Sequence, residues 1–376
     1  MNENSALTPF RIDIPQADIE DLRARLTHTR WPIPVPGRDD RTDFSRGIPL
    51  PYLKELAEYW RDAFDWRAQE AKLNEHEQFT TVVDGQTFHV VQVRSANPRA
   101  IPLLLSHGWP GSFVEYQRLI PLLTDEFHLV VPSLPGFGFS TPLSGTGWEL
   151  ARTTEAYAEI MTRLGYERFA AHGTDIGSGV IGRLAALHPE RVIGTHTGAD
   201  SRLLAFVGDK LPLPDGLSED EIAQLEAVRT EVAAERGYLE IQNHRPDTIG
   251  AALTDSPVGQ LAWIAEKFTT WSGASRPPVD RDQLLTNISL YWFTRSGESS
   301  AQFYYEGEHS GLDWIMAADV PSAWAVFDTH PLMRRALDPW KAIAHWSEFT
   351  EGGHFPAMEE PELLAEDIRT FFRSIS

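Results

Sequence analysis

The stretch that decides the fold reads FAAHGTDIGSGVIGRL over residues 169–184. It begins with a short apolar run and ends in a segment rich in small residues, and between them Asp175 has Gly173 and Gly177 two positions away on either side. Small neighbours are needed at a tight strand-to-helix turn, because strand and helix approach each other closely there. The free N–H groups at the start of the helix also favour a negative charge. The spacing predicts a reactive Asp175 carboxylate at the end of a strand; the alternative is a solvated helix cap.

The segments around this turn alternate between strand and helix. Two continuous apolar runs, residues 101–106 and 127–132, are typical of buried parallel strands. Earlier in the chain, two alternating runs joined by Asp84 and Gly85 predict a β-hairpin. Helices are predicted over residues 113–123, 151–164 and 178–188. This alternation predicts an α/β fold with a mostly parallel central sheet and helices on both faces.

Outside this core, the pattern predicts an arm and an insertion. The N-terminal segment has short amphipathic helices interrupted by prolines and too few apolar residues for a core of its own, so we expect it to wrap around the rest. Alternation stops after residue 203, where Ser218 and Glu221 form a capping box that opens a helix. Strand signals return at residues 320–327 and 343–349. The predicted division is an arm (1–77), a first part of the core (78–203), a helical cap (204–300) and a second part of the core (301–376).

Composition excludes several classes of function. The 376 residues include 33 basic and 54 acidic side chains, a net charge of −21 that phosphates would repel, so we expect no nucleic-acid or membrane partner. There is no cysteine, which removes disulfides, thiolate metal sites and a cysteine nucleophile. No Gly-x-Ser-x-Gly occurs, so a serine hydrolase would lack its nucleophile. No signal peptide and no apolar run of roughly 18–20 residues is present, and we expect a cytoplasmic protein.

A second motif, His-Gly-Trp-Pro at residues 107–110, directly follows the predicted strand 101–106. A turn at this place can direct the backbone N–H of Trp109 toward Asp175. Together with the N–H of Ile176, it would form an oxyanion hole with two donors. The alternative is an ordinary turn at the end of a strand.

A third motif, Gly-Gly-His-Phe at residues 352–355, lies between the last predicted strand and the terminal helix. A histidine late in the chain on a glycine-rich loop is where the α/β-hydrolases place their base, in the chain order nucleophile, acid, histidine. The position of His354 therefore distinguishes it from the other histidines, of which the chain has 13 in total.

With these motifs, the sequence resembles the epoxide hydrolases of the microsomal and juvenile-hormone type, within the α/β-hydrolase superfamily. The similarity covers nearly the whole chain. Its segments are FRIDIPQADIEDLRARLTHTRWP (10–32), HGWPGSFVEY (107–116), GTDIGS (173–178), ERGY (235–238), QFYYE (302–306) and GGHFPAMEEPELLAEDIRTFF (352–372). The resemblance implies an α/β-hydrolase fold with a helical cap and an N-terminal arm. It also implies an enzyme that adds water to an epoxide to give a vicinal diol, with no cofactor and no metal.

The resemblance assigns the covalent chemistry to three core motifs. Asp175 matches the carboxylate that attacks an epoxide carbon and forms an alkyl-enzyme ester, a task for which it needs no activating base. His354 matches the base that deprotonates water to hydrolyse this ester. The amides of Trp109 and Ile176 would then bind the oxyanion of the hydrolysis step.

Two tyrosines of the cap match the family's donors to the epoxide oxygen. They are Tyr238 in ERGY and Tyr304, the first tyrosine of QFYYE. A phenol is neutral at pH 7 and can donate a proton to an alkoxide as the ring opens. Tyr305 is adjacent to the second donor and is the lesser candidate. For each tyrosine the alternative is a buried aromatic residue with one hydrogen bond.

The acid that orients His354 is where the sequence departs from the family. Relatives usually carry a glutamate three residues after the phenylalanine that ends this strand, in a V-F-P-x-E pattern, whereas here VFDTHP places His330 there. Asp328 is the nearest carboxylate, and the usual location of the acid in the superfamily supports it. We therefore expect Asp328 to orient His354, with Glu306 and Asp338 as weaker alternatives.

Two other functions stay open on the sequence. A haloalkane dehalogenase would also use an aspartate nucleophile but needs halide donors, often tryptophan; a catalytically silent binding protein would explain the unusual VFDTHP.

The expected partners are water and a small apolar or aromatic epoxide, and a homodimer is kept as an alternative to a monomer. Microsomal relatives carry a membrane anchor ahead of the arm, whereas this chain starts at the arm, so we expect no anchor. Aromatic candidates for lining an apolar pocket are Trp109, Phe113, Trp263, Trp271 and Trp292.

Overall fold

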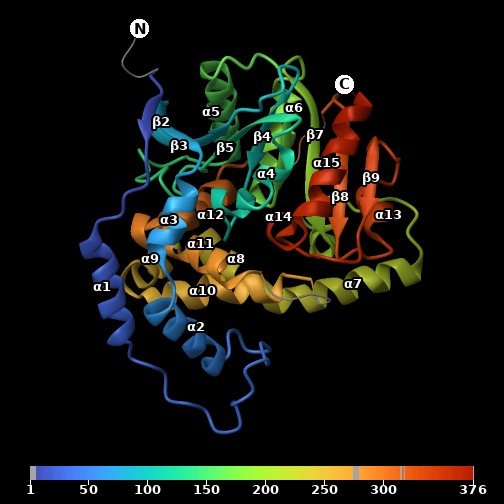
Figure 1. Ribbon diagram of the computed structural model, residues 1–376. Helices are drawn as coiled ribbons and strands as arrows, with labels where there is room; N and C mark the ends of the chain where they lie inside the picture. Colours follow the sequence, from blue (N-terminus) through green and yellow to red (C-terminus); the bar gives the residue numbers. More distant parts are fainter. Residues whose placement is uncertain (1–5, 274–278, 314–315, 317, 376) are drawn as a thin grey trace.

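A nine-stranded sheet forms the centre of the computed structural model, which describes residues 6–273, 279–313, 316 and 318–375 (Figure 1). The strand order is β1-β2-β3-β5-β4-β6-β7-β8-β9, and all pairs from β5 to β9 are parallel, whereas β1, β2, β3 and β5 pair in antiparallel fashion. The strands are β1 (Thr8–Phe10), β2 (Glu77–Val83), β3 (Gln86–Val93), β4 (Ile101–Ser106), β5 (Phe127–Pro132), β6 (Phe169–Thr174), β7 (Val192–Asp200), β8 (Ser322–Phe327) and β9 (His345–Glu348). The mostly parallel α/β fold predicted from the sequence is confirmed.

The predicted hairpin is formed by β2 and β3. Asp84 and Gly85 connect the strands with φ angles of 49° and 78°, the left-handed conformation that a two-residue hairpin turn requires. The prediction missed β7, the strand on which the site depends, because the sequence VIGTHTGAD intersperses polar and small residues among the apolar ones.

Helices cover both faces of the sheet, as predicted. The helices α5 (Leu150–Arg163) and α6 (Ile176–Leu187) pack against each other, and α6 contacts β4, β6 and β7. The terminal helix α15 (Pro361–Ile375) contacts α4 (Ile120–Leu123), α14 (Pro356–Glu359), β7 and β8. The predicted helix over residues 113–123 consists of two short pieces, η2 (Phe113–Gln117) and α4, because Pro121 has no N–H to continue a helix and is tolerated only in the first turn of the second piece. A short α13 (Met333–Leu337) lies between β8 and β9.

The cap is a layer of helices inserted in the chain between β7 and β8, and Figure 1 shows these helices below the sheet. It contains η3 (Ser201–Phe206), α7 (Glu219–Ala233), η4 (Ala234–Arg236), α8 (Gly237–His244), α9 (Pro246–Asp255), α10 (Pro257–Thr270), α11 (Arg281–Thr294) and α12 (Ser296–His309). The capping box forms as predicted, with 2.7 Å from Ser218 N to Glu221 Oε2 and 3.2 Å from Glu221 N to Ser218 Oγ. The boundary predicted at residue 300 falls inside α12, because that helix continues to His309 before β8 begins.

The N-terminal segment runs along the outside of the cap and joins the sheet at β1 (Figure 1). Its helices α1 (Gln16–Thr27) and α2 (Leu50–Asp62) contact α10, and α3 (Trp66–Leu73) contacts α11. The indole N–H of Trp60 donates to Ser289 Oγ at 2.9 Å, and both side chains are buried. The segment therefore braces the cap from outside. Among the described residues, no helix combines the length and the apolar character that crossing a bilayer requires.

Candidate active site

Asp175 lies in the turn between β6 and α6, with φ 50° and ψ −126°. Such a conformation is strained for a residue with a side chain and is concentrated at functional sites. The glycines around it are required by close packing: a first side-chain carbon on Gly177 would lie 1.9 Å from the carbonyl oxygen of Ser106, and one on Gly173 would lie 2.5 Å from the carbonyl oxygen of Gly177. The steric reasoning applied to the sequence therefore holds for this turn.

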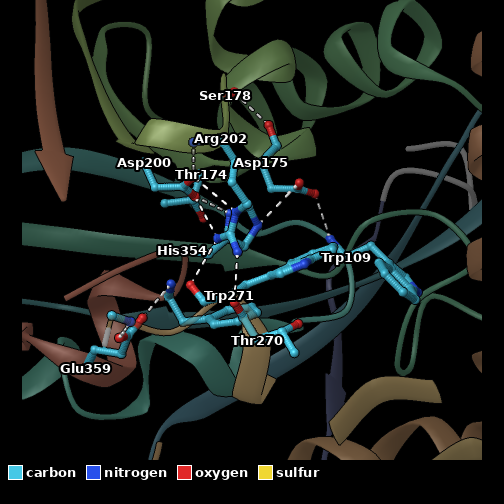
Figure 2. A network of polar contacts seen from close by, with 12 residues as sticks. Trp109, Thr174, Asp175, Ser178, Asp200, Arg202, Thr270, Trp271, His354 and Glu359 are labelled. Atoms are coloured by element: carbon cyan, nitrogen blue, oxygen red, sulfur yellow. Dashed lines mark hydrogen bonds and ion pairs between the residues drawn. The ribbon is translucent and has the colours of Figure 1, made fainter. Parts of the chain in front are cut away.

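The Asp175 carboxylate is held by the turn after β4. The N–H of Trp109 donates to Asp175 Oδ1 at 2.9 Å (Figure 2). Gly108 makes this approach feasible, because a side-chain carbon there would lie 2.3 Å from the same oxygen. Ile176, the other predicted donor, is the first residue of α6, and within the described chain its N–H forms no hydrogen bond with this carboxylate. Of the two backbone N–H groups predicted to form the oxyanion hole, that of Trp109 thus contacts the Asp175 carboxylate.

His354 lies between two carboxylates. Its Nε2 is 3.4 Å from Asp175 Oδ2, and its Nδ1 is 2.6 Å from Asp200 Oδ2 (Figure 2). The backbone of its loop is fixed to the cap, since His354 N donates to the carbonyl oxygen of Trp271 at 2.9 Å. A histidine paired on one nitrogen with an acid and open on the other toward a nucleophile has the arrangement of a general base.

The structure pairs His354 with Asp200 and not with Asp328, the residue that the sequence analysis expected to orient it. Asp200 is the last residue of β7, the strand next to β6, whereas Asp328 follows β8, one strand further away. In the register of β7 and β8, Asp200 pairs with Phe327, so Asp328 lies beyond the end of the paired strands, and it is exposed. The available signal was an acidic residue at the carboxyl end of the strand next to β6, and it was missed because β7 was not predicted.

The two weaker alternatives do not contact the histidine either. Asp338 Oδ1 accepts from the backbone N–H groups of Ala342 and Ile343, at 2.7 and 3.3 Å. Glu306 lies on α12, and no contact of it with His354 is formed within the described residues.

Charge pairing decides the protonation of this cluster. Burial opposes the charged imidazole, but the carboxylates of Asp175 and Asp200 outweigh it and raise the pKa of His354 to about 9. Burial would raise the pKa of Asp200, yet the charge of Arg202 and the hydrogen bond from His354 hold it well below its usual range. The Arg202 guanidinium contacts both oxygens of Asp200, at 3.2 Å from Nε and 3.1 Å from Nη2. Asp200 therefore stays ionised and fixes the imidazole.

Both predicted tyrosines face the same cavity as the nucleophile. Its volume is about 440 Å³, and its lining includes Asp175, His354, Tyr238 of α8 and Tyr304 of α12. The two phenol rings have centroids 6.3 Å apart, and Trp109 stacks on Tyr238 at 4.9 Å. Neither hydroxyl has a hydrogen-bond partner among the described residues. Burial, reinforced by the charge of Asp175, raises the pKa of both phenols, so both are neutral donors at pH 7.

The remaining aromatic candidates are distributed differently. Tyr305 stacks on His309, with ring centroids 4.1 Å apart, and is not among the residues that line the cavity, which agrees with its lower ranking. Of the five predicted lining residues, Trp271 lines the cavity, whereas Trp292 lines a separate surface pocket. Trp109 and Phe113 belong to the hydrophobic core, Trp263 packs against it, and the three are not among the residues that line the cavity.

Two side chains that the sequence did not single out connect the cap to the site. Arg202 Nη2 donates to the carbonyl oxygen of Trp271 at 2.9 Å, at the end of α10. Glu359 accepts from the backbone N–H of Gly273 at 2.8 Å and from that of Phe355 at 3.0 Å (Figure 2). These contacts fix the position of the histidine loop relative to the cap. No group of three His, Asp or Glu side chains among the described residues is placed to hold a metal ion.

Comparison with known proteins connects this geometry to one family. Residues 7–116 match the family described as the epoxide hydrolase N terminus, and residues 101–196 match the alpha/beta hydrolase fold. A protein of Stigmatella aurantiaca, provisionally named an epoxide hydrolase, is 41% identical over 98% of this chain and 85% of its own length. Epoxide hydrolase 1 of Sus scrofa is 35% identical, covering 98% of this chain and 89% of that protein. The structure of Aspergillus niger epoxide hydrolase matches with a TM-score of 0.84 and 30% identity, over 99% of this chain and 97% of that one.

Proposed function

Because the chain belongs to the epoxide hydrolases of the α/β-hydrolase fold, we propose that it opens an epoxide through an ester on Asp175 and releases a vicinal diol. The observation that carries this proposal is one cavity lined by a carboxylate, a paired histidine and two cap phenols. The carboxylate supplies the nucleophile, the phenols supply a proton to the leaving oxygen, and the histidine supplies the base for water.

In the first step, an oxygen of the Asp175 carboxylate bonds to an epoxide carbon as the carbon–oxygen bond of the ring breaks. Tyr238 or Tyr304 donates its phenol proton to the released oxygen and becomes a phenolate. The two tyrosines come from different cap helices and line the same cavity as Asp175, which suits them to donate to the oxygen of an epoxide bound there.

In the second step, His354 takes a proton from water, and the hydroxide attacks the ester carbonyl of Asp175. The oxyanion that forms accepts from the N–H of Trp109, which already donates to Asp175 Oδ1. When the intermediate collapses, the imidazolium protonates the departing diol oxygen. The proton left on the Asp175 carboxyl returns to the phenolate, so the sum is one epoxide and one water consumed and one diol formed.

The substrate is proposed to be a small apolar or aromatic epoxide. The cavity near Asp175 has Leu203, Phe206, Leu211 and Trp271 among its lining residues, which favours apolar substituents. A haloalkane dehalogenase is disfavoured, because the cavity brings two cap phenols to Asp175, the donors that an epoxide oxygen requires.

The reaction is tested by incubating the protein with styrene oxide and, separately, with 1-bromobutane. We expect phenylethane diol to form and no bromide to be released, measured by chromatography and by halide assay. Bromide release without diol would replace the proposal with a dehalogenase. Absence of both reactions, with a range of apolar epoxides, would favour a silent binding protein.

Two matched variants, Asp200→Asn and Asp328→Asn, test which carboxylate orients His354. Asp200→Asn should slow hydrolysis of the ester about a hundredfold or more, because the imidazole loses the charge that orients and stabilises it. Ester formation should change far less, since the nucleophile itself is intact. Asp328→Asn should leave both steps within about twofold, as expected for an exposed side chain that makes no contact with His354 among the described residues. Stopped-flow and quenched single-turnover measurements separate the steps; the reverse pattern would restore Asp328 as the acid.

A further inference from the structure

A buried lysine lies in the cap next to one of the two phenols. Lys267, on α10, is only 5% exposed in its side chain, and lysine is rarely buried unless it is paired. Its Nζ lies 2.6 Å from Glu266 Oε1 and 3.3 Å from Glu235 Oε2. The two carboxylates explain how the ammonium is tolerated, and they fix its position.

The ammonium is directed at aromatic rings of the site. Lys267 Nζ lies 5.3 Å from the ring centroid of Tyr238 and 5.6 Å from that of Trp271. A cation within about 6 Å of an aromatic face is attracted by the ring, most strongly where water is excluded. Tyr238 also stacks on Trp109, with the two ring planes 6° apart. Among the described residues, no cation lies over the ring of the other phenol, Tyr304.

The same lysine also anchors the backbone that carries Tyr238. Glu235 precedes the tyrosine by three residues, and its Oε2 accepts from Thr270 Oγ1 at 3.4 Å as well as contacting Lys267. The link joins η4 to the last turn of α10. The segment that leads into α8 is thus tied to the helix behind it by the ion pair and one hydrogen bond.

We propose that Lys267 is a positioning residue for Tyr238: it fixes the phenol ring and favours transfer of its proton to the epoxide oxygen. The inference rests on the proposed ring-opening step and assigns to Tyr238 a role distinct from that of Tyr304. A phenolate formed at Tyr238 is stabilised by the ammonium over its ring, whereas Tyr304 has no such neighbour. Proton transfer is then carried chiefly by Tyr238, while Tyr304 holds the epoxide oxygen with a hydrogen bond.

Other charges also face Tyr238, and the proposal concerns the contribution of Lys267 among them. Arg202 and Arg236 favour the phenolate, whereas Asp175 and Asp200 oppose it. Asp175 loses its charge as the ester forms, so its opposition weakens during the step in which the phenol gives up its proton.

The test compares Lys267→Met and Lys267→Arg with the unchanged protein and with Lys72→Met, a control at an exposed position of the arm. In single turnovers of styrene oxide, Lys267→Met should slow ester formation roughly tenfold and leave ester hydrolysis unchanged. Lys267→Arg should restore most of the rate, because guanidinium also binds an aromatic face. Equal slowing of both steps would overturn the proposal in favour of a purely structural role.

A double-mutant cycle makes the assignment specific. In a Tyr238→Phe background, Lys267→Met should have no further effect on ester formation, since the proton it assists is gone. In a Tyr304→Phe background, it should still cost roughly tenfold. The same effect in both backgrounds would overturn the pairing of Lys267 with Tyr238.

A measurement that does not depend on catalysis tests the role of Lys267 independently of the proposed reaction. In protein labelled with carbon-13 at the tyrosine Cζ atoms, Lys267→Met should shift the Tyr238 signal, assigned with Tyr238→Phe, and leave the Tyr304 signal in place. An unmoved Tyr238 signal would refute the inference even if epoxide were hydrolysed. Failure of the unchanged protein to form an ester would instead refute the proposed function.

Discussion

Replacing Asp175 by Asn should abolish diol formation, lowering turnover by at least about 10⁴-fold, because a neutral carboxamide is a poor nucleophile toward an epoxide carbon. Asn removes the charge but keeps the hydrogen bond, since its carbonyl oxygen can still accept from the N–H of Trp109, as Asp175 Oδ1 does at 2.9 Å. The measurement is diol formation from styrene oxide, with thermal unfolding as the control for an intact fold. Turnover within about tenfold of the unchanged protein would rule out the ester mechanism.

The same variant should also change the protonation of the base. With one of its two carboxylate neighbours neutralised, His354 should lose part of the stabilisation that raises its pKa to about 9, and the pKa should move toward the ordinary value of 6.5. Proton NMR of the His354 ring, titrated in both proteins, measures the change. An identical pKa in the variant would mean that Asp200 alone sets the charge of the imidazole.

Replacing His354 by Gln should leave ester formation possible and block the second step. Turnover should fall by roughly 10⁴-fold or more, because the imidazole that takes the proton from water in the proposed second step is gone. The protein should then accumulate with one substrate molecule bound covalently, and intact-mass spectrometry should show the added mass in nearly every molecule. Asp175→Asn should show no such adduct.

A matched control for this prediction is His28→Gln, at an exposed position on the arm, which should neither slow turnover nor trap the ester. Failure of His354→Gln to accumulate an adduct, together with loss of turnover, would place the histidine in the first step. In that case the histidine would have to assist the attack by Asp175 on the epoxide.

The residues around the turn at Asp175 could be predicted from the sequence because local steric constraints determine them. Gly173 and Gly177 must be small where β6 meets α6, and Gly108 must be small where the next turn contacts the carboxylate. Local periodicity also predicted the hairpin and the terminal helix, whose apolar residues recur at the spacing of a buried face. The tyrosines Tyr238 and Tyr304 were found through family resemblance, not by any local signal.

The carboxylate that pairs with His354 was not predictable from the sequence, because this pairing depends on the order of the strands in the sheet. Asp200 reads locally as the cap of a short helix, and it does accept from the N–H of Arg202 in that way. Only the placement of β7 beside β6 brings it to His354. Lys267 was missed for a similar reason, since a lysine within an amphipathic helix is usually a solvated residue, and only the packing of α10 against α8 and η4 turns it inward.

In the proposed mechanism, the contact of 3.4 Å between His354 Nε2 and Asp175 Oδ2 would set the order of the two steps. While Asp175 is an anion, it holds the imidazole in its protonated form and so withholds the base from water. Once the proposed ester has formed, that charge is gone, and the imidazole can release its proton to solvent, accept one from water, and regain the lost proton from solvent when Asp175 is again a carboxylate. In this proposal, formation of the ester on Asp175 is what makes the base available for the attack by water.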